Sequence, residues 1–395
     1  MLPQPSLRFT LPSIHDDTKL DCRVYHPQCL RNLSPAGTPW SRQAAIVAHP
    51  YAPLGGCFDD PVVNVVAGTL LELGFLVTTF NFRGAASSEG HTSWTSKPEQ
   101  ADYISVVGFT AYYVHHLHPP PSVCPVDRRQ SPILLLAGYS YGAMVTTRLP
   151  PLDTVMSCFA TPPINTAEAD IRLRAQHFAE EQNALFAAPA SPRRSLGVRV
   201  GGNEDVSRRS HDRNTMVEFE REERIRQSVR ELLMRAKLVY QGYSQWPHDG
   251  DRDEKKGHCL EKVEGPIAFQ SAYLIVSPPV GLVTKLATMS FTNSLSSFWL
   301  RRSGAGGQST TDALIANPTL IIYGDQDGFI TQRKIREWTR RLSGAVTSQC
   351  RYVEVPGAGH FWTERNVIRK RKSHQEPVIY MLAPLSEYQF CPLLW

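Results

Sequence analysis

The sequence has no large excess of charge of either sign. Its 42 Lys and Arg residues against 37 Asp and Glu residues leave a formal charge of +5 over 395 residues, which is a weak field for a chain of this length. The excess positive charges are not gathered into one patch of the sequence, so we expect no nucleic-acid partner. With 42% hydrophobic and 20% charged residues, the composition excludes a wholly disordered, collagen-like or coiled-coil chain.

Closely paired cysteines are also absent. No two cysteines approach the CxxC spacing of structural zinc sites, so we predict thiols in a reducing compartment and no metal site. No phosphate-binding loop is visible either, and we therefore expect no cofactor. The eight cysteines are Cys22, Cys29, Cys57, Cys124, Cys158, Cys259, Cys350 and Cys391.

Segments that would direct the chain to a membrane are missing as well. The start, MLPQPSLRFTLPS, has no basic region followed by a continuous apolar stretch, so we expect no secretory signal and a cytoplasmic protein. The most apolar later stretch, 272–288, is interrupted by two prolines and Lys285 and is shorter than the ~20 residues that cross a bilayer. We expect no stable membrane insertion.

What the sequence does contain is an alternation of short apolar runs with amphipathic helical segments. The run at 44–48 is apolar throughout, as in strands buried on both faces of a parallel sheet. The alternation predicts βαβ units and hence an α/β fold, with a mostly parallel central sheet covered by helices on both faces. Further strands are predicted at 75–80, 133–137, 272–276, 319–323 and 351–355, helices at 98–118, 143–148 and 331–342, and two strands joined by a polar turn within 7–25.

The clearest helix signal lies between Asp60 and Gly74. Asp60 can accept hydrogen bonds from the first amides of a helix, Pro61 suits the first helical position, and Gly74 supplies a stop. Apolar residues recur between them on one face.

A dense charged block interrupts the alternation. Between Glu168 and Glu264 there are 18 acidic and 18 basic residues of the 79 charged residues in the chain. Residues 187–214 lack apolar periodicity and predict a loop, whereas 215–238 predicts a helix that is either solvated on one face or serves as a lid or partner-docking element. The expected organisation is an N-terminal core part (1–165), a charged, partly disordered insertion (166–264), a second core part (265–365) and an irregular tail (366–395).

The strongest functional signal is the segment GYSYG at 138–142. It follows a predicted strand and precedes a predicted helix, the setting in which G-x-S-x-G forms a sharp turn that exposes the serine hydroxyl. Ser140 is therefore the candidate nucleophile. An ordinary glycine-containing turn between strand and helix is the alternative.

A serine hydroxyl is a weak nucleophile without a base and an orienting carboxylate, which in this setting follow in the order Ser, acid, His. Asp327 lies just after the strand predicted at 319–323, and His360 lies on a small-residue loop after the strand predicted at 351–355. We choose Asp327 as the acid and His360 as the base. Asp325 is the second candidate for the acid; its alternative role is to cap a turn.

Two backbone amides are candidates for stabilising a negatively charged oxygen. One belongs to Tyr141, directly after the serine, and the other to the loop that follows the strand at 44–48. Because Pro50 and Pro53 have no N–H group, Tyr51 is the choice in that loop. The alternative for the loop is a plain turn.

Together these segments resemble a known family. AHPYAPLGG, FNFRGAASSEG, GYSYGA, YGDQDGF and GAGHFW are similar to the α/β-hydrolase superfamily, in particular to small predicted serine hydrolases marked by HP-x-x-x-x-GG and NFRG segments, which are relatives of dienelactone hydrolases. The resemblance covers roughly residues 7–160 and 265–365. It implies hydrolysis of a carboxylic ester or thioester through an acyl-enzyme, with Ser140, Asp327 and His360 as the triad.

The chain departs from that family at three places. Ala85-Ala86 stands where a second glycine often follows NFRG, the charged block replaces a short connection or cap, and RKRK at 369–372 and an apolar tail replace a closing helix. Arg83 in the NFRG segment has two readings: it could bind a substrate carboxylate with both guanidinium nitrogens, or it could hold its own loop by hydrogen bonds.

The favoured hypothesis is an intracellular serine hydrolase that needs no cofactor and acts on a small-molecule acyl substrate. A peptidase or amidase with the same triad is one alternative. A catalytically silent interaction protein, docking a partner through 215–238, is the other. The intact set of three side chains weighs against silence.

Overall fold

The computed structural model describes residues 2–32, 40–120, 131–187, 259–280 and 310–363, with the single residues 123, 227 and 231. The basic run at 369–372, the tail at 366–395 and the loop predicted within 188–214 lie outside the described residues. So does the helix predicted at 215–238, apart from Gln227 and Glu231.

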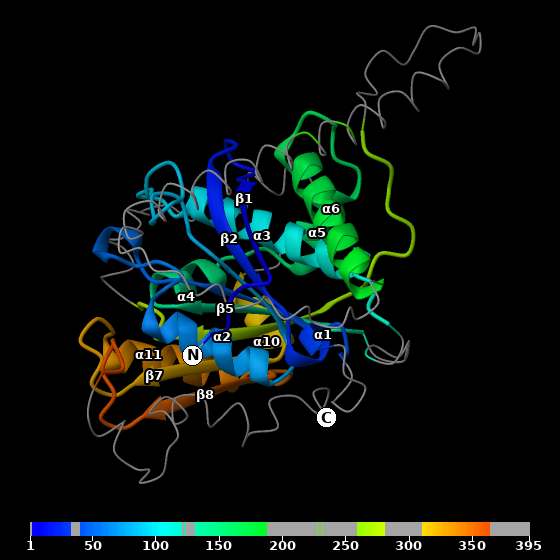
Figure 1. Cartoon of the computed structure of the whole chain (residues 1–395). Coiled ribbons are helices and arrows are strands. Elements are labelled where there is room, and N and C mark those ends of the chain that lie inside the picture. Colours follow the sequence, from blue (N-terminus) through cyan, green and yellow to red (C-terminus); the bar gives the residue numbers. More distant parts are fainter. Residues whose placement is uncertain are drawn as a thin grey trace, which may run out of the picture.

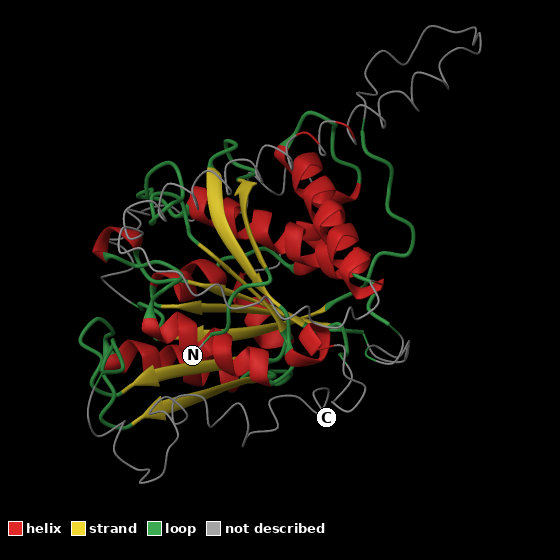
Figure 2. Ribbon diagram, in the orientation of Figure 1, coloured by secondary structure: helices red, strands yellow, loops and turns green. Residues whose placement is uncertain are grey.

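Eight strands form one twisted sheet in the order β1-β2-β4-β3-β5-β6-β7-β8 (Figure 2). β1 is antiparallel to β2 and β2 to β4, and the remaining pairs are parallel. The mostly parallel sheet expected from the sequence is therefore confirmed. The strands are β1 (Leu7–Pro12), β2 (Lys19–Tyr25), β3 (Ala44–Ala48), β4 (Leu76–Phe80), β5 (Ile133–Tyr139), β6 (Gln270–Val276), β7 (Thr319–Gly324) and β8 (Cys350–Val355).

Helices cover both faces of the sheet. One face packs on α2, where Val63, Val66 and Leu70 meet side chains of the central strands. The other face packs on α3, α4, α5, α6, α10 and α11, and Figure 1 shows α3, α5 and α6 gathered on one side of the strands. The helices are α1 (Gln28–Asn32), α2 (Pro61–Glu72), α3 (Lys97–His116), α4 (Tyr141–Thr146), α5 (Leu152–Ala160), α6 (Ala167–Ala187), α10 (Thr310–Ala316) and α11 (Gln332–Ser343).

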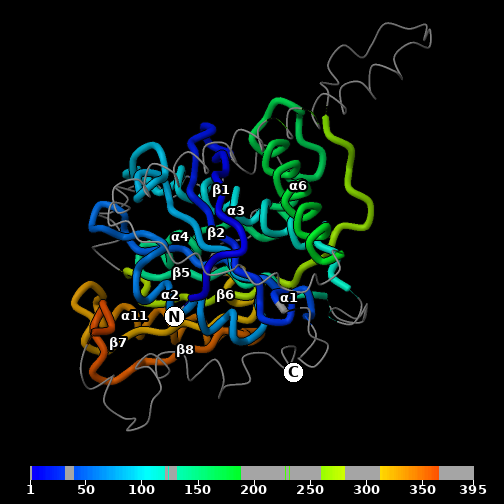
Figure 3. Tube along the Cα trace, viewed as in Figure 1, coloured from blue at the N-terminus to red at the C-terminus, as the bar shows by residue number. Residues whose placement is uncertain are grey.

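The order of the strands brings distant parts of the chain together. β5 lies beside β6 although more than a hundred residues separate them in sequence (Figure 3). Parallel neighbours end at the same edge of a sheet, so the loops after β5, β7 and β8 share that edge. These are the loops in which the sequence places Ser140, Asp327 and His360.

The predicted start and stop of the second helix are confirmed. The Asp60 carboxylate accepts a hydrogen bond from the Val62 amide at 2.8 Å, Pro61 is the first helical residue, and Gly74 has φ +86°. The other strands and helices that are predicted within the described residues also form, with ends shifted by a few residues.

The charged block begins with a long helix that is not predicted from the sequence. α6 lies against α3, and Phe178 packs on Phe9 and Phe109. Two of its charged residues are buried: Arg172 donates to the carbonyl oxygens of Phe159, Ala160 and Glu261, and Arg174 donates to that of Thr10. A high density of charged residues suggests a segment exposed to solvent, and for this reason the helix is not predicted. Here the guanidinium groups of Arg172 and Arg174 instead donate to backbone carbonyl oxygens inside the protein.

The short helices α5 and α10 are likewise not predicted. The segment GAGGQSTT at 304–311 predicts a flexible connector by its composition. This is wrong for its last two residues, Thr310 and Thr311, which begin α10; residues 304–309 lie outside the described residues. A helix of seven residues makes only two turns, which is too short for apolar periodicity to be recognised.

Two helical glycines provide a matched test of the packing. A β-carbon on Gly68 in α2 would meet no atom within 4 Å, whereas one on Gly108 in α3 would lie 2.3 Å from the buried ring of Phe159. We expect Gly68→Ala to raise the free energy of unfolding by about 0.5–1 kcal/mol, the gain in helix propensity. Gly108→Ala should lower it by about 1–3 kcal/mol, because Phe159 must move. Urea unfolding of both variants checks this; equal effects would contradict the described packing of α3 on α5.

Candidate active site

Ser140 sits on a sharp turn between β5 and α4. Its backbone has φ +53° and ψ −116°, a conformation that residues with a side chain rarely adopt. The Ser140 amide donates to the Val276 carbonyl at 2.9 Å, and the Ser140 carbonyl accepts from the Met144 amide at 3.0 Å. The turn is thus fixed on one side to β6 and on the other to its own helix.

The glycines on either side of the serine allow this turn to close. A β-carbon on Gly138 would lie 2.4 Å from the backbone of Gly142, and a β-carbon on Gly142 would lie 2.5 Å from the carbonyl oxygen of Ala48. Both distances are shorter than those at which real β-carbons approach other atoms. The sequence pattern G-x-S-x-G therefore has a direct steric cause here.

His360 lies between Ser140 and Asp327. Its Nε2 is 2.8 Å from the Ser140 Oγ, and its Nδ1 is 2.7 Å from the Asp327 Oδ2. An ionised carboxylate only accepts hydrogen bonds, so Nδ1 carries the proton that is donated to Asp327. In the neutral ring Nε2 is then the acceptor for the Ser140 hydroxyl. His360 is 7% exposed and Asp327 3%, so this connection is shielded from water.

The two candidate acids have different contacts. The second oxygen of Asp327 accepts from the Phe329 amide at 2.9 Å, which orients the carboxylate toward His360. Asp325 instead accepts from the Gly357 amide at 2.6 Å, in the loop that carries the histidine. Of the two candidates, Asp327 contacts the imidazole of His360, and Asp325 contacts the backbone of the loop that carries it.

The loop that carries His360 is held close to two strands. The Tyr139 hydroxyl donates to the His360 carbonyl oxygen at 2.8 Å, and the Gln326 amide donates to that of Ala358 at 2.9 Å. Gly324 allows the close approach, because a β-carbon there would lie 2.0 Å from the Ala358 oxygen. The base is thus positioned by β5 and by the end of β7.

Tyr51 and Tyr141 lie next to each other at the serine turn. Their ring centroids are 5.1 Å apart. Tyr51 precedes a short 3-10 helix, Ala52–Leu54, and its carbonyl accepts from the amides of Leu54 and Gly56. Among the residues that the structure describes, neither the Tyr51 amide nor the Tyr141 amide has a hydrogen-bond acceptor. Both amides are therefore free to donate, and that of Tyr141 belongs to the residue directly after Ser140.

His49 is a residue of this site that sequence reasoning missed. It is fully buried; its Nδ1 lies 2.6 Å from the Pro50 carbonyl oxygen, and its Nε2 accepts from the Phe82 amide at 2.9 Å. Burial lowers its pKa to about 4 despite the hydrogen bond to Pro50, so the ring is neutral at pH 7. The ring joins the Tyr51 loop to the segment FNFRG. In the sequence it stands at the start of the HP-x-x-x-x-GG segment, but no role is predicted for it there.

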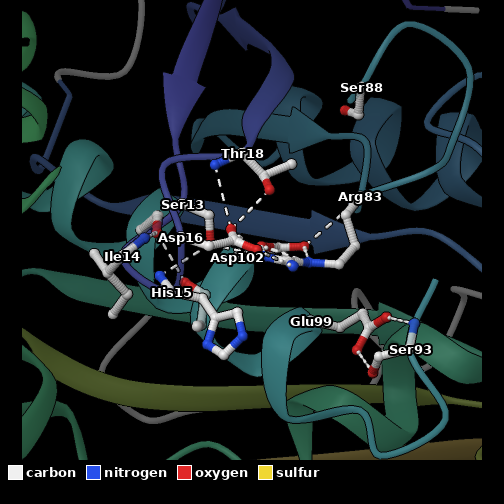
Figure 4. Close-up of polar contacts among 12 residues, drawn as sticks. Ser13, Ile14, His15, Asp16, Thr18, Arg83, Ser88, Ser93, Glu99 and Asp102 are labelled. Atoms are coloured by element: carbon white, nitrogen blue, oxygen red, sulfur yellow. Dashed lines mark hydrogen bonds and ion pairs between the residues drawn. The ribbon is translucent and has the colours of Figure 1, made fainter. Parts of the chain in front are cut away.

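Arg83 is surrounded by acceptors from its own chain (Figure 4). Its guanidinium donates to Asp102 at 2.7 Å, to Asp16 at 2.9 Å and to Ser13 at 3.1 Å. Burial opposes the charge, but the hydrogen bonds to Asp102 and Asp16 outweigh it and raise the pKa of Arg83. Arg83 is expected either to bind a substrate carboxylate or to hold its own loop. These contacts match the second role, because Asp102 and Asp16 already accept the hydrogen bonds of the guanidinium nitrogens.

Within the described ranges, no group of three or more His, Cys, Asp or Glu side chains is arranged to hold a metal ion. None of the described helices is both long and apolar enough to cross a bilayer.

Comparison with known proteins identifies similar chains. A family model described as the alpha/beta hydrolase family matches residues 36–367. None of the curated proteins matches at a significant level. Among solved structures, an alpha-beta serine hydrolase homologue from Coxiella burnetii is 15% identical in sequence, with a TM-score of 0.41. The aligned region covers 91% of this chain and 92% of the Coxiella chain. The serine hydrolase XC6422 from Xanthomonas campestris is 17% identical (99% and 98% covered, TM-score 0.43), and the esterase Pf2001 from Pyrococcus furiosus 12% (97% and 88%, TM-score 0.42).

The Arg83 cluster predicts a response to acid. Burial works against ionisation of Asp16, but hydrogen bonds from Arg83 and Thr18 overcome it and lower the pKa from 3.8 to about 2. A carboxyl group whose pKa is lower in the folded state stabilises the fold above its unfolded pKa, and this stability is lost as the pH falls through the folded value. We expect Asp16→Asn to be less stable than wild type at pH 7, and to lose less free energy of unfolding between about pH 4 and pH 2.

Asp17 is the matched control. Burial and the neighbouring carboxylates of Asp170, Asp16 and Glu168 raise its pKa, so its charge destabilises the fold above the unfolded pKa. Its φ of +61° is one that asparagine tolerates. Asp17→Asn should therefore be at least as stable as wild type at pH 7. Urea unfolding measured at each pH gives both comparisons; an Asp16→Asn curve parallel to wild type at low pH would contradict the prediction.

Proposed function

The chain belongs to the alpha/beta hydrolase family, and from this premise we propose that it is a serine hydrolase, independent of any cofactor, that cleaves a carboxylic ester or thioester of a small molecule through an acyl-enzyme. The observation that carries the proposal is the continuous set of hydrogen bonds from Ser140 through His360 to Asp327.

The first step in this proposal is acylation. The Ser140 Oγ attacks the substrate carbonyl carbon while the His360 Nε2 takes the hydroxyl proton. Asp327 stabilises the imidazolium that results, because it already accepts the Nδ1 proton. The imidazolium then returns the proton to the leaving oxygen or sulfur, and the acyl group stays on Ser140.

Deacylation repeats the same steps with water as the nucleophile. His360 takes a proton from the water, the hydroxide attacks the acyl carbon, and the Ser140 oxygen leaves with the proton. In both steps the carbonyl oxygen becomes negatively charged. The amides of Tyr51 and Tyr141 supply two donors for that oxygen, and one such donor is worth on the order of 3 kcal/mol of barrier in serine hydrolases.

The buried ring of His49 supports this arrangement. It connects the Tyr51 loop to Phe82 through two hydrogen bonds, so the loop is held in place before any substrate binds. Donors fixed in advance stabilise charge without a cost of reorganisation.

Two alternatives remain as outcomes of the tests below. A peptidase or amidase would use the same three side chains on a more stable bond. A silent interaction protein would need none of them. The hydrogen bonds of His360 to both partners favour an active enzyme, since a scaffold gains nothing from a buried ionised Asp327.

Labelling with a fluorophosphonate tests the nucleophile. We expect the wild-type protein to be labelled on Ser140, because an activated serine displaces fluoride from phosphorus. Ser140→Ala should abolish labelling and His360→Ala should reduce it to background. Mass spectrometry of the labelled peptide locates the adduct. A folded wild-type protein that stays unlabelled would favour the silent scaffold.

Substrates matched in their acyl group identify the type of bond that the protein cleaves. An ester, a thioester and an anilide that share one acyl group differ only in the bond, so the ratio of their kcat/KM values separates esterase or thioesterase from amidase. Anilide turnover equal to or faster than that of the ester would overturn the ester assignment.

Asp327 and Asp325 form a matched pair for the role of the acid. Asp327→Asn is expected to lower kcat by about 10⁴-fold, because an amide in place of the carboxylate favours the wrong tautomer of His360. Asp325→Asn should retain far more activity, since it changes a hydrogen bond to the Gly357 amide and not to the imidazole. Steady-state kinetics on the best ester give both values. Loss of the same size in the two variants would remove Asp327 from its proposed role.

A further inference from the structure

Two phenylalanines surround the ring of His360 and are exposed. The Phe329 centroid lies 4.7 Å from that of His360, and the Phe361 centroid 5.4 Å. The two phenylalanines also contact each other, at 5.6 Å and nearly perpendicular. Phe329 is 40% exposed and Phe361 60%, while His360 between them is 7% exposed.

Both rings are presented by ordered backbone. The Phe329 amide donates to Asp327, and the carbonyl of His360, next to Phe361, accepts from the Tyr139 hydroxyl. Exposed aromatic rings gathered beside polar groups that could react are typical of a site that binds an apolar part of a ligand. In the sequence both phenylalanines lie within the segments YGDQDGF and GAGHFW, but no role is predicted for either.

The chemistry of the proposed reaction indicates which part of a substrate meets these rings. The His360 Nε2 returns its proton to the leaving oxygen or sulfur, so that atom must come within hydrogen-bond distance of Nε2. The group bound to it therefore lies beside the imidazole. The carbonyl oxygen, by contrast, lies toward the Tyr51 and Tyr141 amides.

We propose that Phe329 and Phe361 form a binding site for the leaving group, and that the preferred substrates release an alcohol or thiol that carries an aromatic ring. This inference rests on the proposed function. Two rings that already meet nearly edge to face offer a third ring the offset or perpendicular contacts that aromatic groups prefer. Neither phenylalanine offers a hydrogen bond, so an anionic leaving group gains nothing from the site.

The experiment compares esters with one acyl group and different leaving groups. Benzyl butyrate and 2-methoxyethyl butyrate release alcohols of similar acidity, so their kcat/KM ratio reports recognition of the leaving group and not its chemical reactivity. We expect the wild-type enzyme to prefer the benzyl ester by about tenfold, the size of effect that aromatic contacts give. Phe361→Ala and Phe329→Ala should each remove most of this preference while changing the kcat/KM of the methoxyethyl ester far less.

Conservative variants and a distant control keep the test informative. Phe361→Leu and Phe329→Leu keep an apolar side chain, so they should lose part of the benzyl preference and serve where an alanine variant does not fold. Val346→Ala, at a fully exposed position after α11, should leave the ratio unchanged. Replacing benzyl butyrate by benzyl acetate tests the acyl side; the ratio of these two esters should be the same in wild type and in the phenylalanine variants.

The outcomes separate this inference from the proposed function. If Ser140 is labelled and esters are hydrolysed but the phenylalanine variants lower both butyrates by one factor, the leaving-group site is overturned and the hydrolase stands. A change in the acetate-to-butyrate ratio would place the rings on the acyl side and overturn the assignment as well. If Ser140 is not labelled, the proposed function itself fails.

Discussion

The hydrogen bond from the His360 Nδ1 to Asp327 is the interaction on which the site depends. It fixes the tautomer of the imidazole, and the tautomer leaves Nε2 to accept from Ser140. The bond in turn requires that the loops after β7 and β8 meet, which follows from the pairing of these two strands as parallel neighbours. Gly324 and Asp325 then hold the histidine loop against the end of β7. The two hydrogen bonds that connect Ser140, His360 and Asp327 thus follow from the topology of the sheet.

Buried charge organises much of the rest of the molecule. Arg83 binds Asp102 and Asp16, and so ties the segment after β4 to α3 and to the turn between β1 and β2. Arg172 and Arg174 bind carbonyl oxygens beneath α6. Each of these side chains is held by hydrogen bonds that offset the cost of leaving water. The antiparallel pair β1-β2 joins the sheet through the pairing of β2 with β4, and Arg83 additionally connects the turn between β1 and β2 to α3.

The fold and the meeting of Ser140, His360 and Asp327 could be predicted because the segments that carry them have local signals. Short apolar runs indicate buried strands, and the glycines around Ser140 reflect a clash that any side chain would create. What could not be predicted depends on contacts between distant residues. Asp102 lies within α3, and no sequence motif surrounds it. Its structural role becomes visible only through its ion pair with Arg83. His49 becomes a support of its loop only once the Phe82 amide is beside it. α6 was missed because its buried arginines look solvated in the sequence.

The positive φ of Ser140 has a consequence for the evolution of this protein. Any residue other than glycine stores strain at that turn, of order 1–3 kcal/mol, which the surrounding β5, β6 and α4 must overcome. Glycine at this position would relax the backbone and remove the hydroxyl at once. A Ser140→Gly chain is therefore expected to be the more stable of the two, and under the proposed function it is also the one without a nucleophile.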